Sequence, residues 1–577
     1  MKKRLVVLLL TLAMTASVMT GCGATEVATS EPDNSIMTSA DVESEPCEAE
    51  YAASSESATS QNSARRSTEK YDAVAETEAV DEGYAAYDYD DNSDMFEGET
   101  YKEIEANGFK SAKDNPLSTF AADVDTASYS NMRRMIDYGY GIEDFEGTGI
   151  RVEELINYFS YDYNEPEKGE VFGVDATIAD CPWNEENKLL VLGIDTETMK
   201  KREKPDSNIV LLIDVSGSMD SYNKLPLLKE AMKMMVDEFS ENDRISIVTY
   251  ASGTEVVLDG VSGKNKSLIN RKINRLSAGG ATFGEGGIEL AYKVAEEHFI
   301  EGGNNRIFIA SDGDFNVGAS TESELFDLIS EKRDTGIFLS VLGVGMGNYD
   351  DVTMETLADN GNGIYAYIDS LSEAKKVLVD DIDANLYTVA KDTKFQIEFN
   401  PALVSEYRQI GYENRALAAE DFTDDTKDGG ELGSGHQVTV MYEIVLADNG
   451  KGKEGLKYQE QSLSEKGQQA DEWCTLSIAY KEPEGEKSKY LEYPIGIDNY
   501  TTKPSDDYVF AAAVAQVGMA LNNSEYLVDF RDNYDAVAAA RTTVYHMNDR
   551  DELQDEFLDM MDAVLESSSD YYGKYVE

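Results

Sequence analysis

The chain has 577 residues and carries 112 Asp and Glu against 50 Lys and Arg, a formal net charge of −62. At about 150 residues per domain, this length allows three or four folded units. A surface this acidic repels a phosphate backbone and anionic lipid headgroups, which excludes nucleic-acid binding as the main function. The chain has only three histidines, which argues against His-based catalysis and against a His-rich zinc site; they are His298, His436 and His546.

The N-terminus has the pattern of an export signal followed by a lipid anchor. Basic residues at 2–4 precede the apolar stretch Leu5–Val18, which is shorter than a membrane-spanning helix. The next residues, ending in Thr20-Gly21-Cys22, resemble a bacterial lipobox, which implies cleavage before Cys22 and diacylation of its thiol. We therefore expect residues 1–21 to be a signal peptide and lipid at Cys22 to hold the protein on the extracytoplasmic face of the cell membrane. An ordinary signal peptide with a chance cysteine is the alternative.

Residues 22–100 form a strongly acidic segment with few large aliphatic side chains. From Gly23 to Thr100 there are 21 Asp and Glu against three Lys and Arg. Such a composition cannot bury enough apolar area to fold, so we expect a disordered tether. A calcium loop is a weaker interpretation, because Ser93 occupies the position where the sharp turn requires Gly; the oxygen ligands of that loop would be Asp88, Asp90, Asn92, Asp94 and Glu99.

From Asn208 the chain alternates buried strands with amphipathic helices. Ile209–Ile213 is a continuous apolar run, typical of a strand buried on both faces of a parallel sheet, and a helix is expected from Pro226. The same reasoning predicts strands at 245–250, 255–258, 306–310, 337–344 and 364–368, and helices at 266–276, 285–299, 322–332, 352–359 and 371–386. The alternation predicts an α/β fold over residues 205–388, with a doubly wound and mostly parallel sheet that places ligand sites at the carboxyl ends of its strands.

Three strand-end loops of this unit carry oxygen-bearing side chains. The first loop has two serines on alternate residues after an Asp, so their oxygens can face one ion. The second follows a glycine-rich stretch, and the third ends a later strand. Hard oxygen donors favour Mg²⁺, Mn²⁺ or Ca²⁺ over thiophilic metals. The five candidate metal ligands are Asp214, Ser216, Ser218, Thr282 and Asp312.

These five positions resemble the metal-ion-dependent adhesion site (MIDAS) of von Willebrand factor type A domains. That site has Asp-x-Ser-x-Ser, a distant Thr and a distant Asp, and all five match in this order. The resemblance implies binding rather than turnover, because an ion held mainly by neutral hydroxyls keeps positive charge and an open position for a partner's carboxylate. We expect no enzymatic activity, because no nucleophile–base pair or orienting His stands nearby. We interpret Asp314 as a turn residue rather than as a residue that orients a metal ligand.

Five further segments share their pattern with one family of exported bacterial proteins; they are Asn115–Asn131, Arg151–Phe159, Asn223–Lys229, Ser311–Gly318 and Phe510–Ala515. They resemble the YfbK-type von Willebrand factor A family. The resemblance covers about residues 105–577 and implies an architecture rather than a defined role. Asp123 and Asp125 lie within the first segment, just before a helix expected at 127–138. We interpret them as turn and helix-cap residues rather than as ligands of a second metal ion.

Strand-like segments lie on both sides of the central unit. They are expected at 174–178 and 188–194 before it, and at 394–399, 437–446, 474–480 and 491–495 after it. Each set is too small for a good sandwich, so we expect residues 171–204 and 389–500 to form one β-sandwich into which the central domain is inserted. Cys181 and Cys474 lie in the two sets, and either a disulfide or two buried thiols would fit. Residues 101–170 and 501–577 are expected to be helical.

The favoured function is that of a membrane-anchored extracytoplasmic protein-binding module for adhesion or assembly, whose metal captures an Asp or Glu side chain of a protein partner. A structural envelope lipoprotein, in which the metal only stabilises the loops, is the alternative. A cell-wall hydrolase is less favoured, because no carboxylate pair can be singled out among 112 acids and no His-based triad is available.

Overall fold

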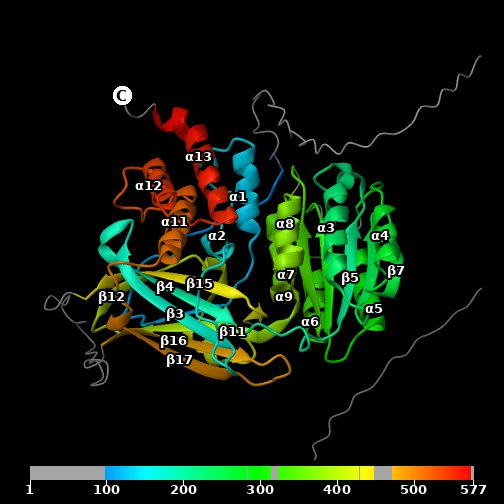
Figure 1. Cartoon of the computed structure of the whole chain (residues 1–577), viewed down its shortest axis with the longest axis horizontal. Coiled ribbons are helices and arrows are strands. Elements are labelled where there is room, and N and C mark those ends of the chain that lie inside the picture. The colour runs from blue at the N-terminus through cyan, green and yellow to red at the C-terminus, as the bar shows by residue number, and fades with distance from the viewer. Residues whose placement is uncertain are drawn as a thin grey trace, which may run out of the picture. The chain divides into compact units, whose positions relative to one another are not determined.

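The computed structural model describes residues 96, 98–282, 284–313, 322–347, 349–427, 429–447 and 471–573. The expected signal peptide, Cys22, most of the acidic tether and Asp314 lie outside these residues. The described residues form three β-sheets with helices packed on them (Figure 1). None of the helices within these ranges combines the length and the apolar character needed to cross a bilayer.

The central sheet has six strands in the order β10-β9-β8-β5-β6-β7. Every neighbouring pair is parallel except β6 and β7, which are antiparallel. All eight residues of β5 are buried, as expected for a strand covered on both faces. The bounds are β5 (Ser207–Asp214), β6 (Arg244–Tyr250), β7 (Thr254–Ser262), β8 (Asn304–Ser311), β9 (Ile337–Gly343) and β10 (Tyr365–Tyr367).

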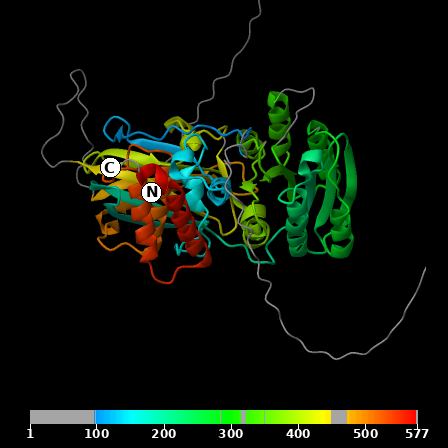
Figure 2. The same cartoon turned by 90° about the horizontal axis from the view of Figure 1, so that it is seen from above.

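Helices cover both faces of this sheet, which confirms the doubly wound fold (Figure 2). Alternate residues of β5 face the two layers, so Leu211 belongs to one hydrophobic core and Leu212 to the other. One layer contains α3 (Leu225–Glu238), α4 (Lys266–Asn274), α8 (Leu371–Lys375) and α9 (Ile382–Leu386). The other contains α5 (Glu285–Glu297), α6 (Glu322–Arg333) and α7 (Asp351–Asn360).

The helix expected at 371–386 is interrupted. A π-helical turn at Lys376–Asp380 separates α8 from α9, and the amide of Asp381 donates to the carbonyl of Lys376, five residues earlier. The side-chain amide of Asn385 then donates to the carbonyl of Val377 at 2.8 Å, which satisfies a backbone acceptor that the wider turn leaves open.

The strands outside the central domain form two antiparallel sheets. One has the order β1-β12-β15-β4-β3, with β1 (Lys110–Ser111), β3 (Phe172–Cys181), β4 (Asn184–Thr196), β12 (Val404–Ile410) and β15 (Gln437–Leu446). The other has the order β13-β2-β11-β16-β17, with β2 (Leu117–Ala121), β11 (Thr388–Phe399), β13 (Ala416–Leu417), β16 (Glu472–Lys481) and β17 (Lys489–Gly496). A short strand, β14 (Gly430–Gly433), pairs with β11.

The two sheets share one hydrophobic core, to which Leu190 and Val440 contribute from the first sheet and Phe395 and Ile478 from the second. Strands from before and after the central domain are neighbours in the first sheet, where β4 pairs with β15. The prediction of a single sandwich with an inserted α/β domain is therefore confirmed.

The segment 101–170 is not purely helical as expected. It contains helices α1 (Ala127–Asp137) and α2 (Val152–Asn157), but β1 and β2 precede them and join the two sheets of the sandwich. The pattern of β2 is too short to be distinguished from a loop, and its pairing with β11 joins residues that are far apart in the sequence.

The folded part begins before residue 101. Phe96 is buried in a hydrophobic core, and Glu99 is enclosed beside Arg134, whose Nη1 and Nη2 lie 2.9 and 2.7 Å from its two oxygens. The acidic tether therefore ends earlier than expected. Because Arg134 engages both oxygens of Glu99, that residue has no free carboxylate to act as the last ligand of a calcium loop.

The C-terminal helices cover the outer face of the first sheet of the sandwich (Figure 1). Alternate residues of β4 again serve two cores, because Leu190 faces the sandwich interior while Leu189 packs with Phe510 and Phe557 of the helices. These helices are α11 (Asp506–Leu521), α12 (Asn533–Tyr545) and α13 (Glu552–Gly573). Short 3₁₀ turns occur at Ile142–Asp144, Gly217–Asp220, Glu413–Arg415, Ala419–Thr423 and Ile497–Asn499.

The cysteines of the sandwich are free thiols. Cys181 belongs to the hydrophobic core between the first sheet of the sandwich and the C-terminal helices, whereas Cys474 belongs to the core inside the sandwich. The disulfide considered from the sequence is therefore wrong, because the two side chains point into different cores. Burial raises the pKa of both thiols above their ordinary value, so both stay protonated at neutral pH.

Candidate metal centre

Asp214 and Asp312 emerge at the same edge of the central sheet. Strands β5 and β8 are parallel neighbours, with Ile213 opposite Ala310, and the two aspartates follow at their carboxyl ends. Both side chains are completely buried. The charge of Asp312 contributes to the raised pKa of Asp214, which places the two carboxylates within electrostatic reach of each other.

The first loop brings three of the predicted ligands together. The amide of Ser216 donates to Asp214 Oδ1 at 2.7 Å, and the hydroxyls of Ser216 and Ser218 lie 2.9 Å apart. The 3₁₀ turn Gly217–Asp220 places Ser218 on the exposed side of this group, while Ser216 is buried. The side-chain oxygens of Asp214, Ser216 and Ser218 therefore extend from the buried edge of the sheet to the protein surface.

The loop that carries Thr282 is bound to the first loop through its backbone. The amide of Gly217 donates to the carbonyl of Gly280 at 2.9 Å, and the amide of Gly279 donates to the carbonyl of Val215 at 2.8 Å. Gly280 has a positive φ of 95°, which few residues other than glycine adopt. Thr282 is half-buried, and within the described ranges its hydroxyl makes no hydrogen bond to the other four predicted ligands. The structure thus places the Thr282 loop beside the other predicted ligands, but the Thr282 side chain is not hydrogen-bonded to them.

Lys224 is a site residue that the sequence analysis missed. Its Nζ lies 2.8 Å from Asp312 Oδ2, and only 8% of the lysine side chain is exposed. The side chain crosses Gly345, where an added Cβ would lie 2.2 Å from Lys224 Cε, so the glycine makes room for it. The available signal was that Lys224 is the single Lys or Arg between Ser218 and the start of α3.

The electrostatics of the site favour a cation. Burial raises the pKa of Asp214 to about 6, and the nearby Asp312 charge adds to this effect. Asp214 Oδ2 is buried and accepts no hydrogen bond of normal geometry from the residues that the structure describes, although the nearby Tyr250 hydroxyl partly opposes the rise in the pKa of Asp214. Two carboxylates and one ammonium leave one net negative charge. An orphaned carboxylate oxygen beside two serine hydroxyls fits a hard divalent cation, which Asp214, Ser216 and Ser218 would hold.

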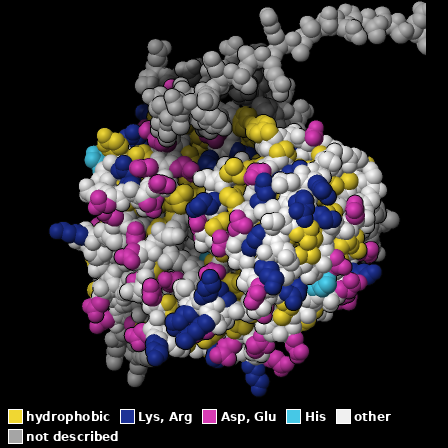
Figure 3. Space-filling model, turned by 45° about the vertical axis from the view of Figure 1, so that its right-hand side comes forward, with side chains coloured by type: hydrophobic (Ala, Val, Ile, Leu, Met, Phe, Trp, Pro, Cys, Tyr) yellow, Lys and Arg dark blue, Asp and Glu magenta, His cyan; other side chains and the backbone are white. Residues whose placement is uncertain are grey.

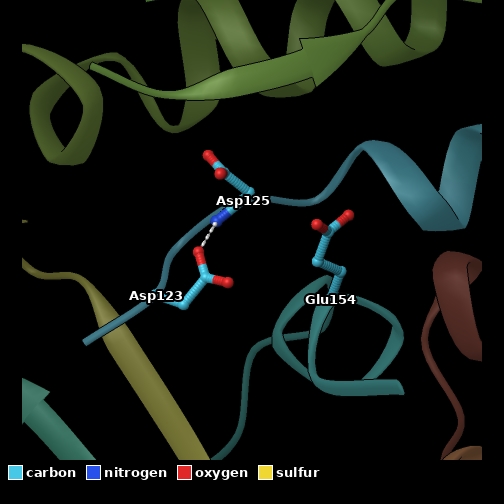
Figure 4. Close-up of side chains that lie close together, drawn as sticks. All are labelled: Asp123, Asp125 and Glu154. Carbon is cyan, nitrogen blue, oxygen red and sulfur yellow. Dashed lines mark hydrogen bonds between the residues drawn. The ribbon is translucent and has the colours of Figure 1, made fainter. Parts of the chain in front are cut away.

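A second group of buried acids, Asp123, Asp125 and Glu154, offers three carboxylate oxygens within 4.8 Å of one another (Figure 4). Asp123 Oδ1 accepts a hydrogen bond from the amide of Asp125 at 3.1 Å, which confirms the predicted turn. The helix-cap prediction is wrong, because the N-cap residue of α1 is Thr126 and has no side-chain capping bond.

Every oxygen of this group is already paired with a protein donor. Arg415 donates to both oxygens of Asp123, at 3.0 and 3.2 Å, and to Asp125 Oδ2 at 3.0 Å. The other three oxygens accept from the backbone amides of Tyr365 and Ser128 and from the guanidinium of Arg151. The group is therefore a structural ion network, and no oxygen remains to favour a metal ion over these donors.

Family models match almost all of the described chain. A model described as von Willebrand factor type A domain matches residues 208–381, one described as von Willebrand factor matches 95–191, and one described as the C-terminal part of the uncharacterized protein YfbK matches 384–566. The uncharacterized protein YfbK of Escherichia coli (strain K12) is 43% identical over 434 residues, which are 74% of this chain and 75% of that protein. The uncharacterized protein sll0103 of Synechocystis sp. is 28% identical over 167 residues, 29% of this chain and 39% of that protein.

Solved structures are more distant. A von Willebrand factor type A protein from Catenulispora acidiphila is 14% identical with a TM-score of 0.37, and the match covers 71% of this chain and 89% of that chain. Proximal thread matrix protein 1 from the mussel byssus, in a structure with a zinc-occupied MIDAS motif, is 22% identical with a TM-score of 0.26 and covers 31% of this chain and 45% of that chain. These similarities are too low to indicate what this chain binds.

Proposed function

Because this chain belongs to the YfbK family and contains a von Willebrand factor type A domain, we propose that it captures a carboxylate of a partner protein through a divalent cation. The observation that carries the proposal is the cluster of Asp214, Ser216 and Ser218 at the carboxyl edge of the central sheet, with one unpaired buried carboxylate oxygen. Mg²⁺ is the expected ion, with Mn²⁺ or Ca²⁺ as substitutes.

The charge balance of the site explains why an acidic group would be attracted. Lys224 offsets the charge of Asp312, whereas no Lys or Arg is paired with Asp214 among the residues that the structure describes. Adding a divalent cation changes the net formal charge of the site from one negative to one positive. Serine hydroxyls do not reduce this charge, so an open coordination position favours an Asp or Glu of the partner.

The surface around the site offers contact area to a protein. Tyr222, four residues beyond Ser218, is 77% exposed. Burial, and then a hydrogen bond with the Tyr222 hydroxyl, raises the pKa of Tyr138 at the end of α1 to about 12. An exposed tyrosine held in this way supplies rigid apolar area beside a charged anchor, as in many protein interfaces.

The attraction for an acidic partner is local to the site. Acidic and basic side chains are interspersed on the face shown in Figure 3. Gly23–Thr100 adds further negative charge, with 21 acidic and three basic residues, to a chain that is acidic throughout. We further propose that lipid at Cys22 anchors the protein on the extracytoplasmic face of the membrane, with this segment as spacer, and that the protein binds its partner without catalysis.

Two measurements test the proposal. Isothermal titration of the purified chain with MgCl₂ measures metal binding, and immobilised protein incubated with envelope extract measures capture with Mg²⁺ and with chelator. We expect both signals to be lost in Asp214→Ala. The matched control is Asp220→Ala, an exposed aspartate in the same turn, which should bind metal and partner like the unaltered protein.

Capture that survives chelation and Asp214→Ala would contradict the proposed function. Metal binding that raises the melting temperature without any metal-dependent partner would favour the structural alternative, in which the ion only rigidifies the loops.

A further inference from the structure

A cavity of about 330 Å³ lies where the central domain meets the flanking segments. Glu355 lines it from α7 of the central domain, and the other lining residues come from outside that domain. They are Lys102, Glu103, Ile104, Glu105, Arg151, Glu153, Glu413 and Asn414. The exposed residues among them, Lys102, Glu103, Glu105 and Asn414, mark the mouth of the cavity.

Glu153 is a buried carboxyl group among the residues that line this cavity. Only 1% of its surface is exposed, and neither carboxylate oxygen accepts a hydrogen bond from another residue that the structure describes. Its oxygen lies against Gly411, where an added Cβ would be 2.7 Å from Oε2. Burial and the charges of Glu413 and Asp123 raise its pKa well above the ordinary value. A buried acceptor that lacks a donor is costly, and a ligand that donates to it would remove the cost.

The cavity lining has more acid than base. It carries five glutamates against Lys102 and Arg151, an excess of three negative charges when all are ionised. Arg151 is already committed, because its Nη1 lies 2.8 Å from Asp351 and 3.4 Å from Glu355. The one buried base in the lining therefore does not offset the charge of Glu153.

The spacing of these acids favours an organic cation over a metal ion. Within the described ranges, the one group of three carboxylates whose oxygens lie within 4.8 Å of one another is Asp123, Asp125 and Glu154, and it is fully paired. The glutamates of the cavity do not form such a cage, whereas an ammonium group needs only two or three acceptors around it. The volume also exceeds that of a single ion and is near the lower end of small-ligand pockets.

We propose that this cavity binds a small alkylammonium ligand, a primary amine or diamine, whose ammonium group donates to Glu153 while its alkyl chain lies along Ile104. Glu413 accepts a hydrogen bond from the amide of Asn107 at 3.3 Å and lies among the lining residues, so it offers a second acceptor. The proposal does not depend on the metal centre, which lies on other loops.

The test uses 1,4-diaminobutane as the probe with the full-length chain at pH 8, where primary amines are protonated. EDTA is present throughout so that divalent ions do not contribute. We expect a saturable rise in melting temperature, and binding at least tenfold weaker in Glu153→Gln, which preserves the shape of the side chain. The same saturable rise is expected in Asp214→Ala, which separates this site from the proposed metal function.

Two controls keep the result interpretable. Glu103→Gln at the exposed mouth should bind within a few-fold of the unaltered protein, and an equal concentration of NaCl should give no saturable shift. If Glu153→Gln does not fold, Glu413→Gln provides the second measurement and should weaken binding severalfold. An absent or non-saturable response, or equal responses in Glu153→Gln and the unaltered chain, would overturn the proposal and leave Glu153 as a protonated core residue.

Discussion

The ammonium of Lys224 lies 2.8 Å from Asp312 Oδ2, although the two residues are 88 positions apart in the sequence. The lysine side chain is 8% exposed and the aspartate side chain is completely buried. A buried carboxylate requires a compensating charge, and Lys224 supplies it in the absence of any ion. We therefore expect Lys224 to stabilise the fold of the candidate metal centre when no metal is bound.

Lys224→Met tests this role. Removing one partner of a buried ion pair costs about 3–5 kcal/mol of unfolding free energy, so the variant should melt well below the unaltered protein in chelator. A saturating concentration of Mg²⁺ should recover much of the loss, because the cation compensates Asp312 instead. Thermal unfolding with and without Mg²⁺ measures this, and Lys229→Met, at a half-buried lysine of the same helix that is not paired with a carboxylate in any described contact, is the control. Equal destabilisation in both conditions would contradict the assigned role.

Asp214→Asn should separate stability from metal binding. The amide oxygen of Asn preserves the acceptor for the Ser216 amide, which lies 2.7 Å from Asp214 Oδ1. Burial raises the pKa of Asp214 to about 6, so its stabilising contribution is lost as pH rises through that value. At pH 7.5 in chelator we expect the variant to be as stable as the unaltered protein or up to about 3 kcal/mol more stable. The Mg²⁺-induced rise in melting temperature should disappear, whereas in Asp220→Asn it should remain.

Gly280→Ala should damage the loop that carries Thr282. Gly280 has a φ of 95°, and an added Cβ would lie 2.6 Å from Ser252 Oγ. The hydroxyl of Ser252 also accepts the amide of Ala281 at 2.9 Å, so the clash displaces that bond. We expect a loss of about 1–2 kcal/mol in unfolding free energy and weaker Mg²⁺ binding by titration. Gly279→Ala is a close control, because its Cβ would meet nothing within 4 Å.

If Mg²⁺ affinity were the same in Gly280→Ala and Gly279→Ala, the Thr282 loop would have no part in the metal centre.

The order of the central elements could be predicted because their apolar patterns are local. Ile209–Ile213 reads as a buried strand from its own residues, and the motif Asp214-x-Ser-x-Ser follows it directly. Strand β12 was missed because it contains Arg408, a residue that local patterns place on the surface. Arg408 is buried only because Glu443 of the neighbouring strand β15 lies 2.8 Å away and opposite it in register. Lys224 was missed for the same reason, since the residue that permits its burial is distant in sequence.

Glu355→Gln tests how the buried acids between the domains limit stability at neutral pH. Glu355 is 6% exposed, and burial raises its pKa to about 7, against the opposing charge of Arg151 at 3.4 Å. Its folded pKa exceeds the ordinary value of 4.5, so its stabilising contribution is complete below pH 4.5 and is lost as pH rises through 7. On this account the unfolding free energy should fall by up to about 3 kcal/mol over that interval.

In Glu355→Gln this part of the pH dependence should disappear, because the side chain no longer titrates. Urea unfolding at several pH values between 4.5 and 8 measures the slope, and Glu105→Gln at the exposed mouth of the same cavity should retain it in full. Glu153 and Glu413 have raised pKa values from burial as well, so a smaller fall with pH should remain in the variant. An unchanged slope in Glu355→Gln would show that Arg151 already holds Glu355 ionised throughout this range. The loss of unfolding free energy with rising pH would then be due to Glu153 and Glu413.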